Sequence, residues 1–225
     1  MMMHNQVAME RLMASTSLKV RPCIKSHKCP WITETVQLPS NITRGICCAT
    51  VGEMDSMLRN TRGRDVLLAN VIVSNSKIHQ VVQLCKEFGP DSGDCTVINT
   101  GENSLRVVVC TDSDGACDSF SSIAGKDGVT VGCLIEINVG QLRCGVDTPE
   151  EVLTLAKHID SLPNLKFLGI QGYNGAIQHV RGRAERRELC ESVAGVLREA
   201  KDLLAQNGFT CEIVSGGGTD SFGFD

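Results

Sequence analysis

The stretch DVLLANVIV, residues Asp65–Val73, decides the fold because it is an almost unbroken apolar run without the alternation of a half-exposed strand. Runs of this kind are typical of parallel strands that are buried on both faces. Six further segments have strand character: Leu18–Ile24, Gly45–Val51, Leu105–Thr111, Val129–Val139, Leu165–Gln171 and Phe209–Val214. The sequence therefore predicts a sheet of seven parallel strands.

Helical patterns lie between these strands. Thr148-Pro149-Glu150-Glu151 predicts a helix start, since Thr suits the N-cap, Pro the first turn, and acids the positive end of the helix dipole. Glu185–Gln206 has apolar residues at helical spacing before a terminating Asn-Gly pair, and Ser76–Phe88 is a shorter example. Alternating strands and helices predict βαβ units, which build either an open doubly wound sheet or a closed (β/α)8 barrel.

Two segments depart from this alternation. Gly89–Ser104 is rich in Gly, Asp, Asn and Ser, which predicts a surface loop with an extra β-hairpin around Thr96–Asn99. Met1–Met13 is expected to be a helix with an apolar stripe over Val7–Met13, because polar residues interrupt any signal-peptide core.

Composition bounds the function classes. The chain has 225 residues, of which 42% are hydrophobic, and a net charge of −4, so a sizeable core can form and nucleic acid is not an expected partner. The apolar runs fall short of the roughly 20 residues of a membrane helix. The 12 cysteines lack the paired spacing of a zinc site, which favours free, buried thiols in a reducing, cytoplasmic compartment.

The first candidate site residue is Lys25, which follows the first predicted strand. Parallel α/β proteins carry their active sites at this carboxyl edge of the sheet. Like charge from the nearby Arg21 and Lys28 would favour the uncharged amine that a Schiff base requires. Taken alone, a solvated lysine in a salt bridge is the simpler interpretation.

Three other features follow predicted strands. The run SGGGT at residues 215–219 lets backbone N–H groups converge on an anion, although it also suits a flexible turn. Arg143 lies in a turn bracketed by Gly140 and Gly145, from which its guanidinium can bind a phenolate or a carboxylate. The alternative is a surface arginine in a loop. Tyr173 is the only tyrosine, suited to contact a ligand ring or to wedge a strand against a helix. With the lysine, these features form a set that suits pyridoxal 5'-phosphate (PLP).

Six motifs in order resemble one known family. They are R-P-x-x-K-[ST]-H-K-C-P, G-I-x-C-A-T-x-x-E, D-x-L-L-A-N, E-x-x-V-G-x-x-R-C-G-V, L-G-x-Q-x-Y-x-G-x-x-Q-H and S-G-G-G-T. Over nearly the whole chain they resemble the D-threonine aldolase and D-serine dehydratase family, which are fold-type III PLP enzymes related to alanine racemase. The resemblance implies an alanine-racemase-like (β/α) TIM-type barrel.

The resemblance also implies residue roles. Lys25 matches the Schiff-base lysine, His27 matches a catalytic or supporting position, and Arg143 matches the arginine at the phenolic oxygen of the cofactor. The other implied cofactor-binding residues are Asn70, Gln171, Tyr173, Ser215, Gly216, Gly217, Gly218 and Thr219.

The activity implied is that of a PLP-dependent lyase on D-β-hydroxy amino acids, either an aldolase that cleaves the Cα–Cβ bond or a dehydratase that releases ammonia. A non-catalytic PLP-binding or homeostasis protein on the same barrel is the alternative, and an inactive remnant is a third. The implied partner is a small D-amino acid, with a homodimer left open.

Three departures from the family pattern affect these expectations. Cys23 stands where the family has His in R-P-H-x-K, so a proton donor is lost or replaced by a thiol. The phosphate loop continues G-T-D-S-F where the family tends to G-T-G-T-Y. The chain ends at Asp225, before the eighth strand and the β domain that carries the family's divalent-metal ligands. We therefore expect a single domain over residues 1–225, an incomplete barrel, no metal site and poor turnover.

Overall fold

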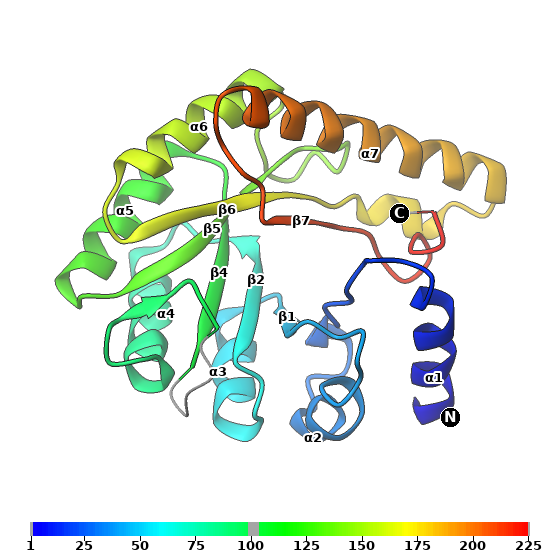
Figure 1. Cartoon of the computed structure of the whole chain (residues 1–225), viewed down its shortest axis with the longest axis horizontal. Helices are drawn as coiled ribbons and strands as arrows, with labels where there is room; N and C mark the ends of the chain where they lie inside the picture. The colour runs from blue at the N-terminus through cyan, green and yellow to red at the C-terminus, as the bar shows by residue number, and fades with distance from the viewer. Residues whose placement is uncertain (1, 99–103, 225) are drawn as a thin grey trace.

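The strands form one parallel sheet that curls toward a barrel in the computed structural model, which describes residues 2–98 and 104–224 (Figure 1). The order in the sheet is β1-β2-β4-β5-β6-β7, and the short β3 pairs with the start of β5. Their bounds are β1 Ile46–Cys48, β2 Asp65–Val71, β3 Asp94–Cys95, β4 Arg106–Thr111, β5 Thr130–Glu136, β6 Leu165–Gly172 and β7 Ile213–Gly216.

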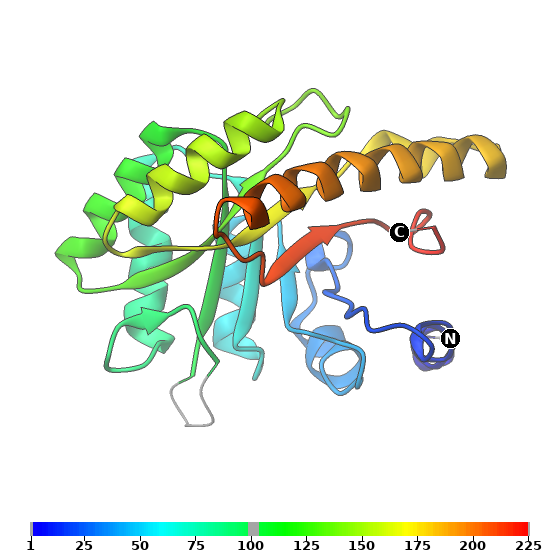
Figure 2. The ribbon, with the colours of Figure 1, turned by 45° about the horizontal axis from the view of Figure 1, so that its top comes forward.

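The helices that follow β1 cover the outer side of the curl, whereas the N-terminal helix lies apart from the strands (Figure 2). The helices are α1 Met2–Met13, α2 Pro30–Ile32, α3 Val51–Asn60, α4 Asn75–Phe88, α5 Asp114–Lys126, α6 Pro149–Ser161 and α7 Arg183–Gln206, with helical turns η1 Ile24–Ser26, η2 Thr33–Gln37 and η3 Gly175–His179. The predicted start of α6 is confirmed as a reciprocal capping box between Thr148 and Glu151. Within the described residues, every helix is too short or too polar to serve as a membrane span.

The first predicted strand is much reduced. In place of a strand over Leu18–Ile24, the structure has two isolated parallel bridges, from Val20 to Thr43 and from Cys23 to Cys47. Pro22 explains the interruption, because it has no N–H to donate to a neighbouring strand, although its carbonyl accepts from Cys47 N at 2.9 Å. This segment nevertheless runs beside β1 and extends the sheet by one parallel element.

Outside the strand–helix alternation, the predicted helix over Met1–Met13 is confirmed as α1, whereas the predicted hairpin is not found among the described residues. There is no hairpin at Thr96–Ile98, because Asp94 Oδ1 accepts from the backbone N and the hydroxyl of Thr96 and turns the chain; Asn99 lies outside the described residues. Helix α1 forms, but it buries no residue, and Val7 and Leu12 of the expected stripe are exposed. Its inward side instead carries Glu10, which accepts a hydrogen bond from Ser40 Oγ at 2.5 Å.

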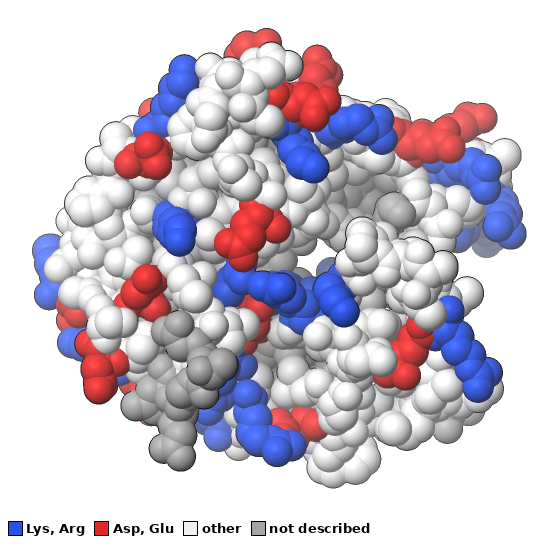
Figure 3. Space-filling view, viewed as in Figure 1, with Lys and Arg blue, Asp and Glu red and all other residues white. Residues whose placement is uncertain are grey.

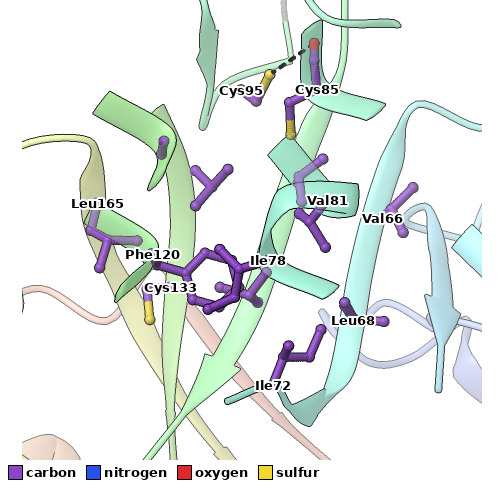
Figure 4. Close-up of a cluster of buried hydrophobic side chains, with 14 of the residues drawn as sticks. Val66, Leu68, Ile72, Ile78, Val81, Cys85, Cys95, Phe120, Cys133 and Leu165 are labelled. Carbon is purple, nitrogen blue, oxygen red and sulfur yellow. Dashed lines mark hydrogen bonds between the residues drawn. The ribbon is translucent and has the colours of Figure 1, made fainter. Parts of the chain in front are cut away.

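The core has two parts, one on each face of the sheet. The larger part lies between strands and helices, where Leu68 of β2 lies near Ile78 of α4 and Phe120 of α5 packs beside them (Figure 4). The smaller part fills the inside of the curl with Leu67, Val108, Cys110, Leu134 and Leu168. The strands are thus buried on both faces, as the unbroken apolar runs predict.

Charged side chains connect the amino ends of the strands across the inside of the curl. Arg21 Nη1 lies 2.6 Å from Asp65 Oδ1 at the start of β2, and Arg106 Nη2 lies 2.8 Å from Glu212 Oε1, just before β7. Arg44 links the two pairs, at 3.5 Å from Asp65 and 3.9 Å from Glu212. On one face of the molecule, acidic and basic side chains gather around a central hollow (Figure 3).

Gly169 offers a test of how closely β6 and β7 must approach. Its φ is +143°, and a Cβ atom there would lie 1.9 Å from the carbonyl oxygen of Ile213 in β7. Gly169→Ala should therefore separate the two strands and lower the free energy of unfolding by about 2 kcal/mol or more, as measured by denaturant titration.

The matched control is Gly195→Ala in α7, where a Cβ would have no neighbour within 4 Å. Alanine is a better helix former than glycine, so this variant should be neutral or gain up to about 1 kcal/mol. Equal stability of the two variants would contradict the close approach of β6 and β7.

Candidate functional site

The carboxyl ends of β5, β6 and β7 form one rim of the sheet. Glu136 of β5 is in register with Gln171 of β6, which is in register with Ser215 of β7. These three side chains therefore form a row across adjacent strands. Leu134, two residues before Glu136, belongs to the inner part of the core, so the row faces the inside of the curl.

Lys25 reaches the same rim from the start of the chain. It lies in η1, just after the bridge between Cys23 and Cys47, and is exposed. Its Nζ lies 5.8 Å from the ring centroid of Tyr173, the residue that follows β6. The fold thus brings together two residues separated by most of the chain, and the amine faces an aromatic ring at cation–π distance.

The two cations that lie near Lys25 in the sequence each face a carboxylate in the structure. Arg21 turns to Asp65 at the opposite end of β2, and Lys28 Nζ lies 3.6 Å from Glu53 Oε1. Each of the two cations is offset by a carboxylate rather than directed at Lys25. The sequence does not reveal this, because both carboxylates come from elements that follow later in the chain.

The glycine run after β7 forms a tight loop against η3. Gly217 has a φ of +74°, and a Cβ on Gly216 would lie 2.7 Å from the carbonyl oxygen of Gly172. A Cβ on Gly218 would lie 2.7 Å from Gln178 Nε2. Only glycines allow this close approach, and the loop borders a small cavity that Tyr173 also lines.

Two side chains outside the predicted set fix this loop. Ser221 Oγ accepts from Gly218 N at 2.8 Å, and Gln178 Oε1 accepts from Asp220 N at 2.7 Å. Ser215 is half-buried and Thr219 is exposed at the two ends of the run. Sequence reasoning missed Ser221 and Gln178, because their partners are loop backbone atoms rather than a recognisable motif.

Arg143 lies in a rigid turn near Glu136. Asn138 Oδ1 accepts from Gly140 N at 3.2 Å and from Leu142 N at 3.1 Å, and Gly145 N donates to Asp112 Oδ2 at 3.0 Å. Arg143 is exposed, and its charge stabilises the ionised carboxyl of Glu136. The turn therefore holds a guanidinium at the same rim.

Asn70 and His27 are both held by their own surroundings. Asn70 Nδ2 donates to Ala49 O at 3.1 Å, which ties β2 to the end of β1. His27 Nδ1 accepts from Cys29 N at 3.0 Å, and Gln37 Nε2 lies 3.2 Å from His27 Nε2. Both ring nitrogens of His27 therefore have a partner within residues 27–37.

Glu136 is a site residue that sequence reasoning did not single out. It is only 3% exposed, and Gln171 Nε2 donates to its Oε2 at 2.7 Å. Burial raises the pKa of Glu136 to about 7, while the Gln171 hydrogen bond and the Arg143 charge oppose the rise. The available signal was an acidic residue at the end of an otherwise apolar strand.

Metal binding has no direct support in the geometry. Among the residues that the structure describes, no group of three or more His, Cys, Asp or Glu side chains could hold a metal ion. The expectation that this chain carries no metal site remains a prediction.

Comparisons with known proteins give consistent results. A model of the family described as "Alanine racemase, N-terminal domain" matches residues 95–223. D-threonine aldolase from Arthrobacter sp is 32% identical over 98% of this chain and 53% of its own length. 3-Hydroxy-D-aspartate aldolase from Paracoccus denitrificans (strain Pd 1222) is 35% identical over 80% of this chain and 42% of its own length.

Solved structures agree with the fold. The crystal structure of D-threonine aldolase from Filomicrobium marinum matches all of this chain with a TM-score of 0.88 and 30% identity, over 55% of its own chain. D-threo-3-hydroxyaspartate dehydratase from Delftia sp. HT23, at 20% identity and a TM-score of 0.81, supports the fold alone.

This chain spans about half the length of these relatives. The curled parallel sheet with its outer helices confirms the predicted incomplete alanine-racemase-like barrel. Since the family match covers more than half of the chain, the protein belongs to the alanine racemase N-terminal domain family.

Proposed function

We propose that this chain is the PLP-binding part of a lyase that acts on D-β-hydroxy amino acids. The observation that carries the proposal is the meeting of Lys25 Nζ with the Tyr173 ring, on the rim where the glycine loop follows β7. The names of the relatives, D-threonine aldolase and 3-hydroxy-D-aspartate aldolase, support the substrate class. Those relatives are about twice as long as this chain, so the full activity that we propose is that of a longer protein.

The residues at the rim fit a flat, phosphorylated cofactor. The glycines of the loop at residues 215–219 let its backbone pack closely against Gly172 and Gln178. A loop backbone without side chains suits contact of its N–H groups with a phosphate. Tyr173 offers an aromatic face beside the Lys25 amine, and Arg143 adds a positive charge that suits a phenolate or a carboxylate. When bound, PLP supplies an electron sink for cleavage next to the α-carbon.

The surrounding side chains orient these groups. Glu136 holds the amide nitrogen of Gln171, which leaves the Gln171 carbonyl oxygen for a ligand. Both ring nitrogens of His27 are engaged within its own segment, and this favours a positioning role for His27 over proton transfer. Asn70 similarly stabilises the end of β1 rather than offering its amide N–H groups freely.

The central test is the removal of the amine at position 25. Incubated with PLP, the protein should develop the absorbance band of a lysine-linked cofactor, and borohydride should fix the cofactor mass on the peptide that contains Lys25. Lys25→Ala should abolish both signals. Lys28→Ala is the matched control, because Lys28 is three residues away but faces Glu53, and it should keep both signals.

Assays of substrate turnover distinguish a lyase from a non-catalytic PLP-binding protein. We expect D-threonine to yield glycine and acetaldehyde, or D-serine to yield pyruvate and ammonia, and L-threonine to be inert. Cofactor uptake without turnover of either D-amino acid would favour the non-catalytic PLP-binding alternative. Fixation of the cofactor on another lysine would contradict the proposed site altogether.

The pH dependence of stability tests the environment of Glu136. Its folded pKa of about 7 exceeds its ordinary value of 4.5, so the folded state retains a proton that the unfolded state has lost between these pH values. The resulting stabilisation is complete below about pH 4.5 and is lost as the pH rises to about 7. Glu136→Gln keeps a neutral side chain, so relative to wild type it should gain up to roughly 3 kcal/mol over this range.

Denaturant unfolding of both proteins from pH 4.5 to pH 8 measures this difference. The Gly195→Ala variant is the control, because it adds or removes no titrating group, and its difference from wild type should stay constant. A wild-type and Glu136→Gln pair that follow parallel curves would show that burial does not hold back the ionisation of Glu136.

A further inference from the structure

Cys23 and Cys47 lie directly opposite each other where the first extended segment meets β1. They are partners in a parallel bridge, and Cys47 N donates to Pro22 O at 2.9 Å. Residues paired in this way have their side chains on the same face of the two strands, so the two thiols are neighbours. Neighbouring strands are about 4.8 Å apart, which lies within the Cα separations that a disulfide spans.

The two thiols have opposite environments. Cys23 is exposed, and the hydrogen bond from Cys47, the backbone N–H of Lys25 and the charge of Lys25 hold the pKa of Cys23 well below its usual range, against the effects of burial and Glu53. The same hydrogen bond, together with burial, raises the pKa of Cys47. The pair therefore consists of an exposed cysteine whose surroundings favour the thiolate and a half-buried cysteine whose surroundings favour the protonated thiol.

Accessibility separates this pair from the other paired cysteines. Cys85 and Cys95 also lie close together, since Cys95 Sγ donates to the backbone oxygen of Cys85, and the thiols of Cys117 and Cys133 influence each other's pKa. All four residues are buried in the core. Figure 4 shows Cys85, Cys95 and Cys133 among the packed side chains, where a dissolved oxidant has no approach. Among the cysteine pairs in the described part of the chain, the Cys23–Cys47 pair is the one that includes an exposed residue.

We propose that Cys23 is a site of oxidation by hydroperoxides and that Cys47 resolves the product to a disulfide. The Cys23 thiolate attacks one peroxide oxygen, so an S–O bond forms, the O–O bond breaks and an alkoxide or hydroxide leaves. The Cys47 sulfur then gives up its proton and attacks the sulfenic sulfur of Cys23, so the S–S bond forms and water leaves. The two thiols lose two electrons in total, which reduce the hydroperoxide to an alcohol or water.

This site is independent of the proposed PLP chemistry, because neither step needs the cofactor. It is also adjacent to that chemistry, since Cys23 is two residues from Lys25 and contacts its backbone N–H. A disulfide would replace the thiolate that accepts this hydrogen bond. We therefore expect the oxidised protein to take up less PLP than the reduced protein, provided that the proposed function holds.

The test uses the reduced full chain, without cofactor, and a few equivalents of hydrogen peroxide. Intact mass should fall by two hydrogen atoms, and peptide mapping should find Cys23 linked to Cys47. In Cys47→Ser, dimedone should trap a sulfenic acid at Cys23. Cys29→Ser is the control, because Cys29 is a half-buried cysteine near the pair, and it should form the Cys23–Cys47 disulfide like the wild type.

A measurement on the wild type keeps the test independent of whether the variants fold. At neutral pH, iodoacetamide should alkylate Cys23 about tenfold faster than Cys29 or Cys144, as quantified by peptide mapping. Alkylation of Cys23 at the rate of the other two, or oxidation that links Cys23 to a different cysteine, would overturn the proposal. PLP uptake before and after oxidation is a separate readout. No uptake by the reduced protein would count against the proposed function, whereas equal uptake in both states would show that the disulfide does not affect the site around Lys25.

Discussion

The curl of the sheet is the constraint on which the site depends. Charge pairs hold the amino ends of non-neighbouring strands together, because Glu212 before β7 meets the buried Arg106 of β4 and also Arg44 before β1. Removing one member of such a pair leaves the other charge poorly compensated, and this is costly when that charge is buried. A flat sheet would place the segment around Lys25 and the end of β6 at opposite edges, so the curl is what allows these distant parts of the chain to form one site.

Close backbone contact between β6 and β7 also holds strands together, toward the carboxyl end of the sheet. Gly169 and Gly216 each allow β6 and β7 to pack where a methyl group would collide with a carbonyl oxygen. The register that results places Glu136, Gln171 and Ser215 in one row. The glycines thus have two roles, since those within strands allow the strands to pack closely and those at the end of β7 allow a tight loop against η3.

The sequence predicted the parts of this structure that depend on local chemistry. Unbroken apolar runs identified β2, β4, β5 and β6 because their residues are buried on both faces, and the capping box of α6 followed from Thr148 and Glu151 alone. The site residues Lys25 and Tyr173 could be named because parallel strands end at a common rim. Predictions failed where a single residue overrode a local pattern, as Pro22 did for the first strand and Asp94 for the expected hairpin.

Long-range pairings were not predictable in the same way. Nothing near Arg21 or Lys28 in the chain indicates that Asp65 and Glu53 offset their charges. Likewise, the apolar stripe of α1 has the spacing of a core helix, yet α1 buries none of it, because periodicity indicates which residues share a face and not what covers that face.

Burial sorts chemically identical groups of this protein into inert and reactive ones. Of the 12 free cysteines, seven are buried. Most of these seven belong to the hydrophobic core, where they act as small apolar packing groups. The same polypeptide places Cys23 in solvent beside a cation and a donor thiol. Glu136 shows the reverse case, because a carboxyl that would be ionised in solvent retains its proton up to about neutral pH when the inside of the curl encloses it. The rim of the sheet is therefore where the fold converts ordinary side chains into groups with unusual acidity, since it is there that the dry interior and the solvent meet over a few residues.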